Sequence, residues 1–359
     1  MQRPLLFTIL TVGSLLISSC TAPQTLTTER SIDAVMSAYA APDAPGASVL
    51  VMDGDSIVFR KAYGLASVKD RVPFTVSTNV RLASVTKQFT AMSILILKEQ
   101  GKLSLDDKIL KFFPDFPLYG KEITVRNLLN HTSGLWDYED FVPDTQTYQV
   151  KDADCLTLMF RAESLYFPAG SQYRYSNTGY ALLALIVERT SGQRYADFVK
   201  QHIFDKAGMS TSVAFEEGIS IVPNRAYGHS LMNGAWVEAD QSNTSAVLGD
   251  GGIYSNAEEM SRWISTLFAF SLIPEPLQRE AWRDAAANDG SLIPYGMGWH
   301  VEEYNGARHP HHAGSTRGFR NHLLLFPEKE RMVIILTNRN QGAPISEAKR
   351  IAELLWGGN

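Results

Sequence analysis

The chain has 359 residues, of which 45% are hydrophobic and 20% charged, and these proportions exclude a disordered or fibrous protein. Its net charge is −5 and no run of five basic residues occurs, so nucleic acid is not an expected partner. Two cysteines, Cys20 and Cys155, are too few for a disulfide framework or a four-cysteine zinc site. The length predicts one large or two medium domains with a substantial core.

The first twenty residues have the order of an export signal. Arg3 gives a weakly basic start, residues 5–17 are mostly apolar, and small residues lead to Cys20. The end of this segment is similar to a bacterial lipobox, in which the cysteine becomes the lipidated first residue. We therefore expect a signal peptide over residues 1–19, a membrane anchor on Cys20 and a threonine-rich tether over residues 20–29. The alternative is a plain signal peptide with an incidental cysteine.

Anchoring at Cys20 would place the protein at the bacterial cell envelope, facing the periplasm. No Asp follows Cys20, which favours the outer over the inner membrane by analogy with enterobacterial sorting. Cys155 would then be the one remaining thiol, and we expect it to be buried and unpaired. The sequence does not indicate the oligomeric state.

The predicted elements divide into two strand-rich ends and a helical middle. The N-terminal end has apolar residues at helical spacing over 30–40, then strands at 46–52 and 56–63 around an Asp-Gly turn. In the middle, residues 85–100 are apolar on several faces and predict a buried helix. Further predicted helices are 178–190, 194–206 and one that a capping box opens at Asn256. The C-terminal end predicts strands at 298–303, 319–326 and 331–338, then a helix at 345–356 that opens at Pro344.

This order predicts an antiparallel sheet built from both ends of the chain, flanked by the N- and C-terminal helices, with a mainly helical region inserted between them. The expected fold class is α/β plus α. We assign residues 30–82 and 290–359 to the sheet domain and residues 83–289 to the helical domain. The crevice between two such domains is the natural ligand site.

Several common catalytic motifs are absent from the sequence. It contains no G-x-S-x-G, no Walker A loop, no G-x-G-x-x-G after a strand and no H-E-x-x-H. Four histidines do cluster, but no nearby carboxylate completes an obvious ligand set; they are His309, His311, His312 and His322. We therefore expect neither a metal nor a cofactor.

One constellation remains, and it begins with an S-x-x-K motif from Ser84 to Lys87 at the start of the most apolar helix. Residues three apart share a helix face, so the amine can meet the hydroxyl. A serine becomes a nucleophile when a base takes its proton, and the N–H groups at a helix start favour a developing oxyanion. By itself the motif is also explained by Ser84 acting as a helix cap.

Two further stretches carry matching chemistry. Tyr175 precedes another apolar helix, and a phenol beside an ammonium can shuttle its proton, while Asn177 can orient the lysine and a substrate amide. Later come His312, Gly314 and Ser315, where a glycine lets a substrate backbone lie along a strand edge. Each stretch also has an interpretation without catalysis. The first could be a Ser-Asn helix cap preceded by a core tyrosine, and the second an ordinary strand glycine beside a surface histidine.

Taken together, these stretches resemble the serine β-lactamase and penicillin-binding-protein superfamily. The nearest branch is similar to class C β-lactamases, D-Ala-D-Ala carboxypeptidases and their esterase and D-aminopeptidase relatives. The resemblance runs from about residue 31 to residue 340, through five stretches in the family's order. They are RLASVTKQFTAMSILILKEQGKLSLDDKI, VRNLLNHTSGL, YRYSNTGYALLALIVERTSG, GDGGIYSNAEEMSRW and HHAGSTRGF with FPEKERMVIILTN.

The resemblance implies a role for each matching residue. Ser84 would be the acylated nucleophile, Lys87 would help to take its proton, and Tyr175 would be the general base or proton relay that also activates water. Asn177 would position substrate, and the backbone N–H groups of Ser84 and Ser315 would form the oxyanion hole. His312 occupies the position of the lysine in K-T-G, with Gly314 as its glycine. The H-T-S-G-L stretch at 131–135 and the Gly251-Gly252 pair are interpreted as structural.

The third motif departs from the K-T-G pattern, in which lysine and threonine help to bind a substrate carboxylate. His312 is only part-charged near neutral pH and Ala313 has no hydroxyl. Loss of a charged hydrogen bond, worth ~1.5–3 kcal/mol, could weaken the binding of a carboxylate-bearing substrate ten- to a hundredfold. Arg317 or Arg320 could replace it, and Arg317 is our candidate carboxylate contact because arginine offers bidentate geometry.

The sequence thus predicts an exported serine hydrolase that acts through an acyl-enzyme on esters or D-amino-acid-type amides, with weak β-lactam turnover at most. One alternative is a class C β-lactamase or D-Ala-D-Ala carboxypeptidase proper. An alternative of another class is a non-catalytic protein that uses the crevice to hold an envelope ligand.

Overall fold

The computed structural model describes residues 22–143, 145–304 and 306–357. At its centre lies a six-stranded sheet, ordered β12-β13-β14-β15-β1-β2 and antiparallel throughout. Both ends of the chain build it, which confirms the predicted fold class. The strands are β1 (Ala47–Asp53), β2 (Ser56–Tyr63), β12 (His300–Tyr304), β13 (Ala307–Thr316), β14 (Phe319–Phe326) and β15 (Arg331–Thr337).

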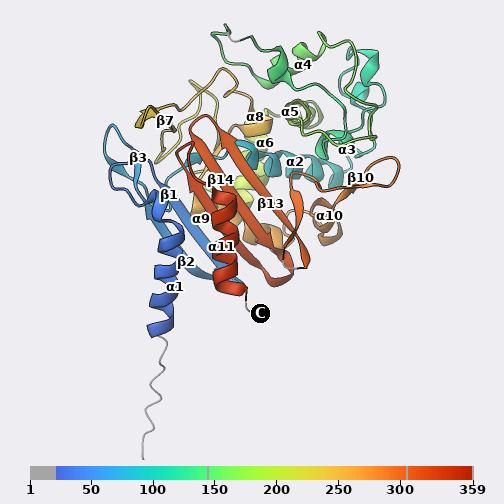
Figure 1. Cartoon of the computed structure of the whole chain (residues 1–359). Helices are drawn as coiled ribbons and strands as arrows, with labels where there is room; N and C mark the ends of the chain where they lie inside the picture. The colour runs from blue at the N-terminus through green and yellow to red at the C-terminus, as the bar shows by residue number, and fades with distance from the viewer. Residues whose placement is uncertain (1–21, 144, 305, 358–359) are drawn as a thin grey trace, which may run out of the picture.

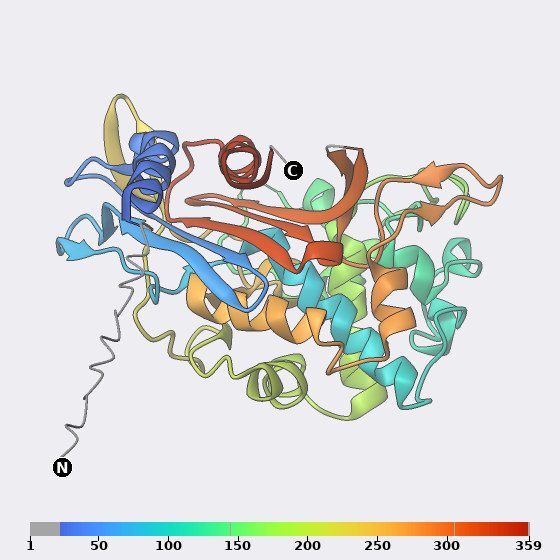
Figure 2. The same ribbon diagram turned by 90° about the horizontal axis from the view of Figure 1, so that it is seen from below.

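Helices cover both faces of this sheet. The terminal helices α1 (Ala22–Val35) and α11 (Pro344–Trp356) lie on one face, and α9 (Ala257–Phe268) lies on the other (Figures 1 and 2). Alternation along β1 explains the two layers. Val49 packs towards the terminal helices with Ile335, whereas Leu50 belongs to the larger core on the opposite side.

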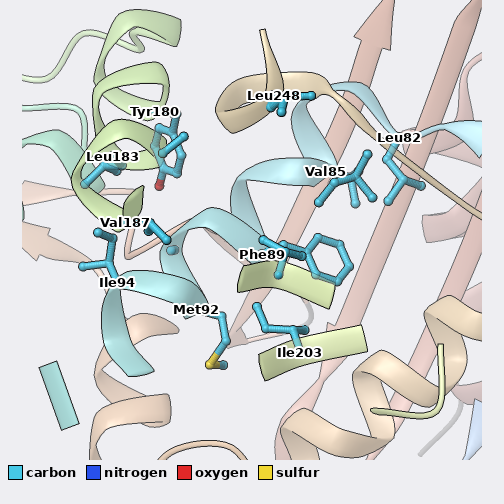
Figure 3. Close-up of a cluster of buried hydrophobic side chains, with 14 of the residues drawn as sticks. Leu82, Val85, Phe89, Met92, Ile94, Tyr180, Leu183, Val187, Ile203 and Leu248 are labelled. Carbon is cyan, nitrogen blue, oxygen red and sulfur yellow. The ribbon is translucent and has the colours of Figure 1, made fainter. Parts of the chain in front are cut away.

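The larger core is built around α2 (Lys87–Glu99), whose residues 87–97 are all buried. Figure 3 shows Phe89 and Met92 of this helix and Val85 of the turn before it, with Tyr180, Leu183 and Val187 of α5 (Asn177–Ser191) beside them. Phe89 also stacks on Trp263 of α9, with ring centroids 4.5 Å apart. Because α2 is enclosed on all sides, residues at its N-terminal end are held rigidly.

Shorter elements surround these helices. The short helices are α3 (Val125–Leu129), α4 (Asp152–Met159), α6 (Tyr195–Val199), α7 (Asp205–Ala207), α8 (Leu248–Gly251) and α10 (Glu275–Ala281). The short strands are β3 (Leu65–Ser67), β4 (Val72–Pro73), β5 (Val80–Arg81), β6 (Val213–Ala214), β7 (His229–Met232), β8 (Ala235–Glu238), β9 (Ile253–Ser255), β10 (Ala285–Ala286) and β11 (Leu292–Ile293). Cys155 of α4 is buried and unpaired, as predicted.

Three local predictions differ from the structure. Residues 22–29, predicted as a tether, are helical in α1, because extending a helix that is already packed costs less than starting one. The helix predicted over 194–206 contains a π-helical turn at Lys200–Phe204. Asn256 does cap α9 by accepting from the Glu259 N–H, but the Glu259 carboxylate accepts from Ser212 and Thr211 rather than completing a capping box.

The signal peptide over residues 1–19 and the lipid anchor on Cys20 lie outside the described residues and stay predictions, as do envelope localisation and the domain boundaries. Within the described ranges, no helix is long and apolar enough to cross a membrane.

A buried histidine in β14 makes the stability of the fold depend on pH. His322 lies opposite Ile335 in the layer beneath α11, and neither of its ring nitrogens has a hydrogen-bond partner among the described residues. Burial, followed by the positive potential of His311 and Lys349, holds the pKa of His322 well below its ordinary value. At a pH just below the ordinary histidine pKa, His322 therefore stays neutral in the folded protein but binds a proton in the unfolded chain.

His322→Leu should therefore stabilise the protein, and the gain should grow with acidity. At pH 8 we expect about 1 kcal/mol from removing unpartnered buried nitrogens. Below pH ~6.5 only the unfolded wild-type chain gains a proton here, so the gain should rise by about 1.4 kcal/mol per pH unit. Urea unfolding at pH 8, 6 and 5 measures this difference. A gain that does not change with pH would contradict the buried neutral state. In the control His202→Leu, on the partly exposed π turn, burial lowers the pKa of the histidine by less, so the gain should rise less with acidity.

Candidate active site

Ser84 lies in a 3-10 turn, Ala83–Thr86, that leads directly into α2. Residues three apart eclipse one another in such a turn, which places Nζ of Lys87 3.4 Å from Oγ of Ser84. The preceding residue, Ala83, has a φ of 52°, a left-handed conformation that costs free energy for a residue with a side chain. The packing of α2 and β13 around the turn thus holds strained backbone beside the hydroxyl.

The Lys87 side chain is fully buried and is held by side chains and backbone from distant parts of the chain. Besides Ser84 Oγ, Nζ donates to Oδ1 of Asn177 at 2.8 Å and to the carbonyl of Asp250 at 3.0 Å. All three oxygens lie within 3.4 Å of Nζ. The lysine is therefore fixed in position towards Ser84.

Tyr175 lies in the segment that enters α5. Its ring centroid is 4.9 Å from Lys87 Nζ, and its ring packs 4.2 Å from that of His131. The next residue, Ser176, caps α5 by accepting from the Gly179 N–H. The structure thus places Tyr175 beside Lys87, and the helix cap positions it there.

The H-T-S-G-L stretch lies behind Tyr175. His131 is buried with a φ of 60°, and its Nδ1 accepts from the Ser176 N–H at 3.1 Å. Burial, with the Lys87 charge adding to it, holds the pKa of His131 well below its ordinary value, so the ring is neutral and can accept this bond. Gly134 turns the chain with a φ of 71°, where an added Cβ would lie 2.2 Å from the Phe167 carbonyl. The stretch therefore supports the tyrosine without facing the pocket.

Asp250 and Asp137 were missed at the sequence level although both support the site. The Asp250 carboxylate accepts from Tyr138 Oη at 2.9 Å, while its carbonyl accepts from Lys87. Burial raises the pKa of Asp250 to about 6, against the opposing pull of Lys87. Asp137 accepts from the Asn177 N–H at 2.9 Å. The available signal for Asp250 was its place in the G-D-G-G stretch, which folds as the short helix α8.

A small pocket of about 60 Å³ opens beside Ser84. Ser315 and Thr316 of β13 line it together with Ser84 and Asn177. Gly314 lets the strand come this close, since an added Cβ would lie 2.0 Å from the Leu82 carbonyl. The structure thus brings Ser84, Asn177 and Ser315 together around one opening.

His312 does not reach this pocket. It shares the inward face of β13 with Gly314, is fully buried, and its Nε2 lies 2.9 Å from Tyr295 Oη. Burial, with His300 and Lys87 adding to it, holds the pKa of His312 well below its ordinary value. The ring is therefore neutral near pH 7, in contrast to the part-charged side chain expected from the sequence.

The cation that lines the pocket is Arg81, and it is neither of the arginines considered from the sequence. Arg317 is exposed in the turn after β13 and is not among the lining residues. Arg320 donates to the carbonyls of Thr316 and Phe319 in its own hairpin. Arg81 is 3% exposed and is anchored by the Gly251 carbonyl at 3.1 Å. It lies three residues before Ser84, a spacing that could have indicated it.

The acidic side chain of Glu139 lines the same pocket as Arg81. Partial desolvation at the rim raises the pKa of Glu139 to about 7, and the charges of Asp137 and Asp250 act in the same direction, although the side chain remains exposed. The pocket is therefore lined by one cation, Arg81, and by two weakly acidic carboxyl groups, of which Asp250 already accepts from Tyr138 while Glu139 is exposed.

The histidine cluster does not form a metal site. In the described ranges, no group of three or more His, Cys, Asp or Glu side chains is placed to hold a metal ion. His311 and His322 lie on the α11 side of the sheet, whereas His312 faces the opposite way. Strand alternation thus separates residues that are adjacent in sequence.

Comparison with known proteins agrees with this geometry. The Beta-lactamase family matches residues 32–355. Penicillin-binding protein 4* of Bacillus subtilis (strain 168) is 30% identical over 327 residues, which cover 86% of this chain and 72% of that protein. The D-aminopeptidase of Gluconobacter oxydans (strain 621H) is 27% identical over 87% of this chain, which spans only 59% of its length.

A solved structure is similar over nearly the whole described fold. The octameric penicillin-binding protein homologue from Pyrococcus abyssi superposes with a TM-score of 0.80 at 26% identity, over 92% of this chain and 77% of that one. The family match, the relative at 30% identity and this fold agree with one another. The chain therefore belongs to the Beta-lactamase family, the serine hydrolases of β-lactamase and penicillin-binding-protein type.

Proposed function

We propose that the protein hydrolyses esters or D-amino-acid-type amides through a covalent acyl-enzyme on Ser84. The observation that carries this proposal is the Lys87 amine, held 3.4 Å from Ser84 Oγ by Asn177 and Asp250, with the Tyr175 ring beside it. A lysine without such support would not hold one position relative to the hydroxyl.

The residues suggest the following steps. Ser84 Oγ attacks the substrate carbonyl, and its proton passes to the Lys87–Tyr175 pair. The backbone N–H groups of Ser84 and Ser315 stabilise the oxyanion, and the pair returns the proton to the leaving alcohol or amine. Tyr175 then takes a proton from water as the water attacks the acyl carbonyl, and the Lys87–Tyr175 pair passes that proton to Ser84 Oγ as the acid product leaves.

The proposed substrate class rests on the two residues of β13 that differ from the K-T-G pattern, His312 and Ala313. His312 is buried and neutral and Ala313 has no hydroxyl, so neither can bind the carboxylate that a β-lactam or a C-terminal D-Ala carries. The one lining cation, Arg81, is 3% exposed and already donates to the Gly251 carbonyl and to Gln241. Glu139 at the pocket rim can instead accept from the free amine of a D-amino-acid amide. A relative 27% identical is a D-aminopeptidase. Esters and aminoacyl amides therefore suit this pocket better than β-lactams.

Intact-protein mass spectrometry tests the acyl-enzyme. The wild-type protein should gain one fluorophosphonate mass, and Ser84→Ala should gain none because Oγ is the atom that is labelled. Ser77→Ala, at a serine outside the pocket, should label like the wild type. Absence of an adduct with both a fluorophosphonate and a labelled penicillin would overturn the proposed mechanism, and so would an equal adduct on Ser84→Ala.

A further inference from the structure

A second pocket, larger than the one beside Ser84, opens at the other end of the sheet. It has a volume of about 510 Å³, within the range of small-molecule sites. It lies between the ends of β12, β13 and β14, the residues after α10, and the last turns of α11, near the mark of the C-terminus in Figure 1. We call it the C-terminal pocket.

Aromatic side chains form its walls. Phe326 of β14 lies at the centre, with its ring 5.3 Å from Trp356, 6.0 Å from Tyr304 and 4.4 Å from His309. Phe326, Tyr304 and Trp356 are each only partly buried, so these rings keep apolar surface in contact with solvent. Trp282 closes the α10 side. Flat, rigid walls of this kind favour a planar apolar group.

The charged rim of the pocket is predominantly basic. It contains five basic side chains and two acidic ones, and both acids are engaged: Asp284 with Arg308, and Glu328 with Arg279. A third arginine, Arg331, pairs with Asp53 from outside the pocket.

Two cations remain. Among the described residues, no acidic side chain lies within ion-pair distance of Arg283 or Lys329, and both are exposed at the rim. Positive charges beside apolar walls favour a ligand that carries a negative group on an apolar body.

This pocket is separate from the active site. Arg308, His309 and Pro310 line it, whereas Ser315 on the same strand lines the pocket beside Ser84. At ~3.3 Å per residue, the five steps along β13 from Pro310 to Ser315 span about 17 Å. A ligand in the C-terminal pocket would therefore not be a substrate held by Ser84.

We propose that the C-terminal pocket binds a small amphiphilic anion, with a planar apolar body against the exposed surfaces of Phe326 and Trp356 and an acidic group at Arg283 and Lys329. The body removes aromatic surface from water, and the acidic group pairs with the two cations that the fold leaves unpaired.

Titration of the full-length protein with the aromatic sulfonate 8-anilinonaphthalene-1-sulfonate tests the proposal by fluorescence and calorimetry. We expect one saturable site. 1-Naphthylacetate should displace the probe, and 1-naphthylmethylammonium, which has the same ring with the opposite charge, should not. Equal displacement by both compounds would overturn the anionic specificity.

Matched double variants locate the site. Arg283→Gln with Lys329→Gln should raise the Kd at least ~10-fold, because each lost charge-assisted bond is worth about tenfold or more. Lys69→Gln with Lys121→Gln makes the same change in net charge at exposed positions outside the pocket and should leave the Kd within twofold. An equal weakening in both double variants would show attraction by net charge alone and refute the site.

Protein labelled on Ser84 by the fluorophosphonate separates this proposal from the proposed hydrolase function. Labelled protein should bind the sulfonate with unchanged affinity. Loss of binding on labelling would place the probe in the active site and overturn the C-terminal pocket. Failure of the labelling itself would bear on the hydrolase function and leave the titration result standing.

Discussion

Tyr175→Phe should lower kcat for 4-nitrophenyl butyrate and for D-phenylalaninamide by at least ~10²-fold. The variant keeps the ring that packs on His131 and lies near Lys87, so it removes the phenolic proton and little else. Loss of a positioned acid–base group has an effect of this size. Steady-state hydrolysis of both substrates measures it.

Tyr173→Phe provides the matched control. The same hydroxyl is removed two residues away, in the same aromatic cluster, from a side chain that does not contact Lys87. Its kcat should stay within about threefold of wild type. If Tyr175→Phe retained near-normal turnover, Tyr175 would lose its role as proton relay, and a fall of equal size in Tyr173→Phe would show that the cluster acts only through packing.

Gly314→Ala should abolish most activity through geometry alone. The new Cβ would lie 2.0 Å from the Leu82 carbonyl, a backbone atom that cannot rotate away, so β13 must move off the turn that carries Ser84. Misplacing reacting groups by about 1 Å costs on the order of 10²-fold, and overpacking costs ~1–3 kcal/mol of stability. We expect both losses, measured as kcat/KM and as the free energy of unfolding in urea.

Gly251→Ala tests whether the effect is steric. An added Cβ there has no neighbour nearer than 3.7 Å, from Ala83 and Arg81, which is ordinary contact. Its free energy of unfolding should stay within ~1 kcal/mol of wild type. Normal kcat/KM in Gly314→Ala would mean that the close approach of β13 to Leu82 is not needed for the reaction.

The extent of several elements could be predicted because their causes are local. Strands at 56–63 and 319–326 match β2 and β14, and the Pro344 helix start matches α11. Alternating apolar residues, turn residues and a helix-opening proline act on their near neighbours in the chain. Less local features were missed: α8 is too short for a periodic pattern, and the helicity of residues 22–29 continues from a segment packed on the sheet.

The proximity of Ser84 and Lys87 could also be predicted from their spacing, because two residues three positions apart lie on the same face of a helical turn wherever that turn is in the fold. The same reasoning failed for His312. Its charge depends on burial by Tyr295 and on which face of β13 turns inward, and neither follows from the residue type.

The amino-acid sequence by itself predicted the sheet formed by both chain ends and the proximity of Ser84 to Lys87, because periodicity and short spacing act between neighbours, and its resemblance to known proteins indicated the family. Only the tertiary structure decided what surrounds them. The acceptors that fix Lys87 lie 90 and 163 positions away, and Arg81 rather than Arg317 faces the pocket. The C-terminal pocket likewise joins side chains from six elements and their connections. Such contacts arise when distant segments pack together, and their charges follow from the burial that packing imposes.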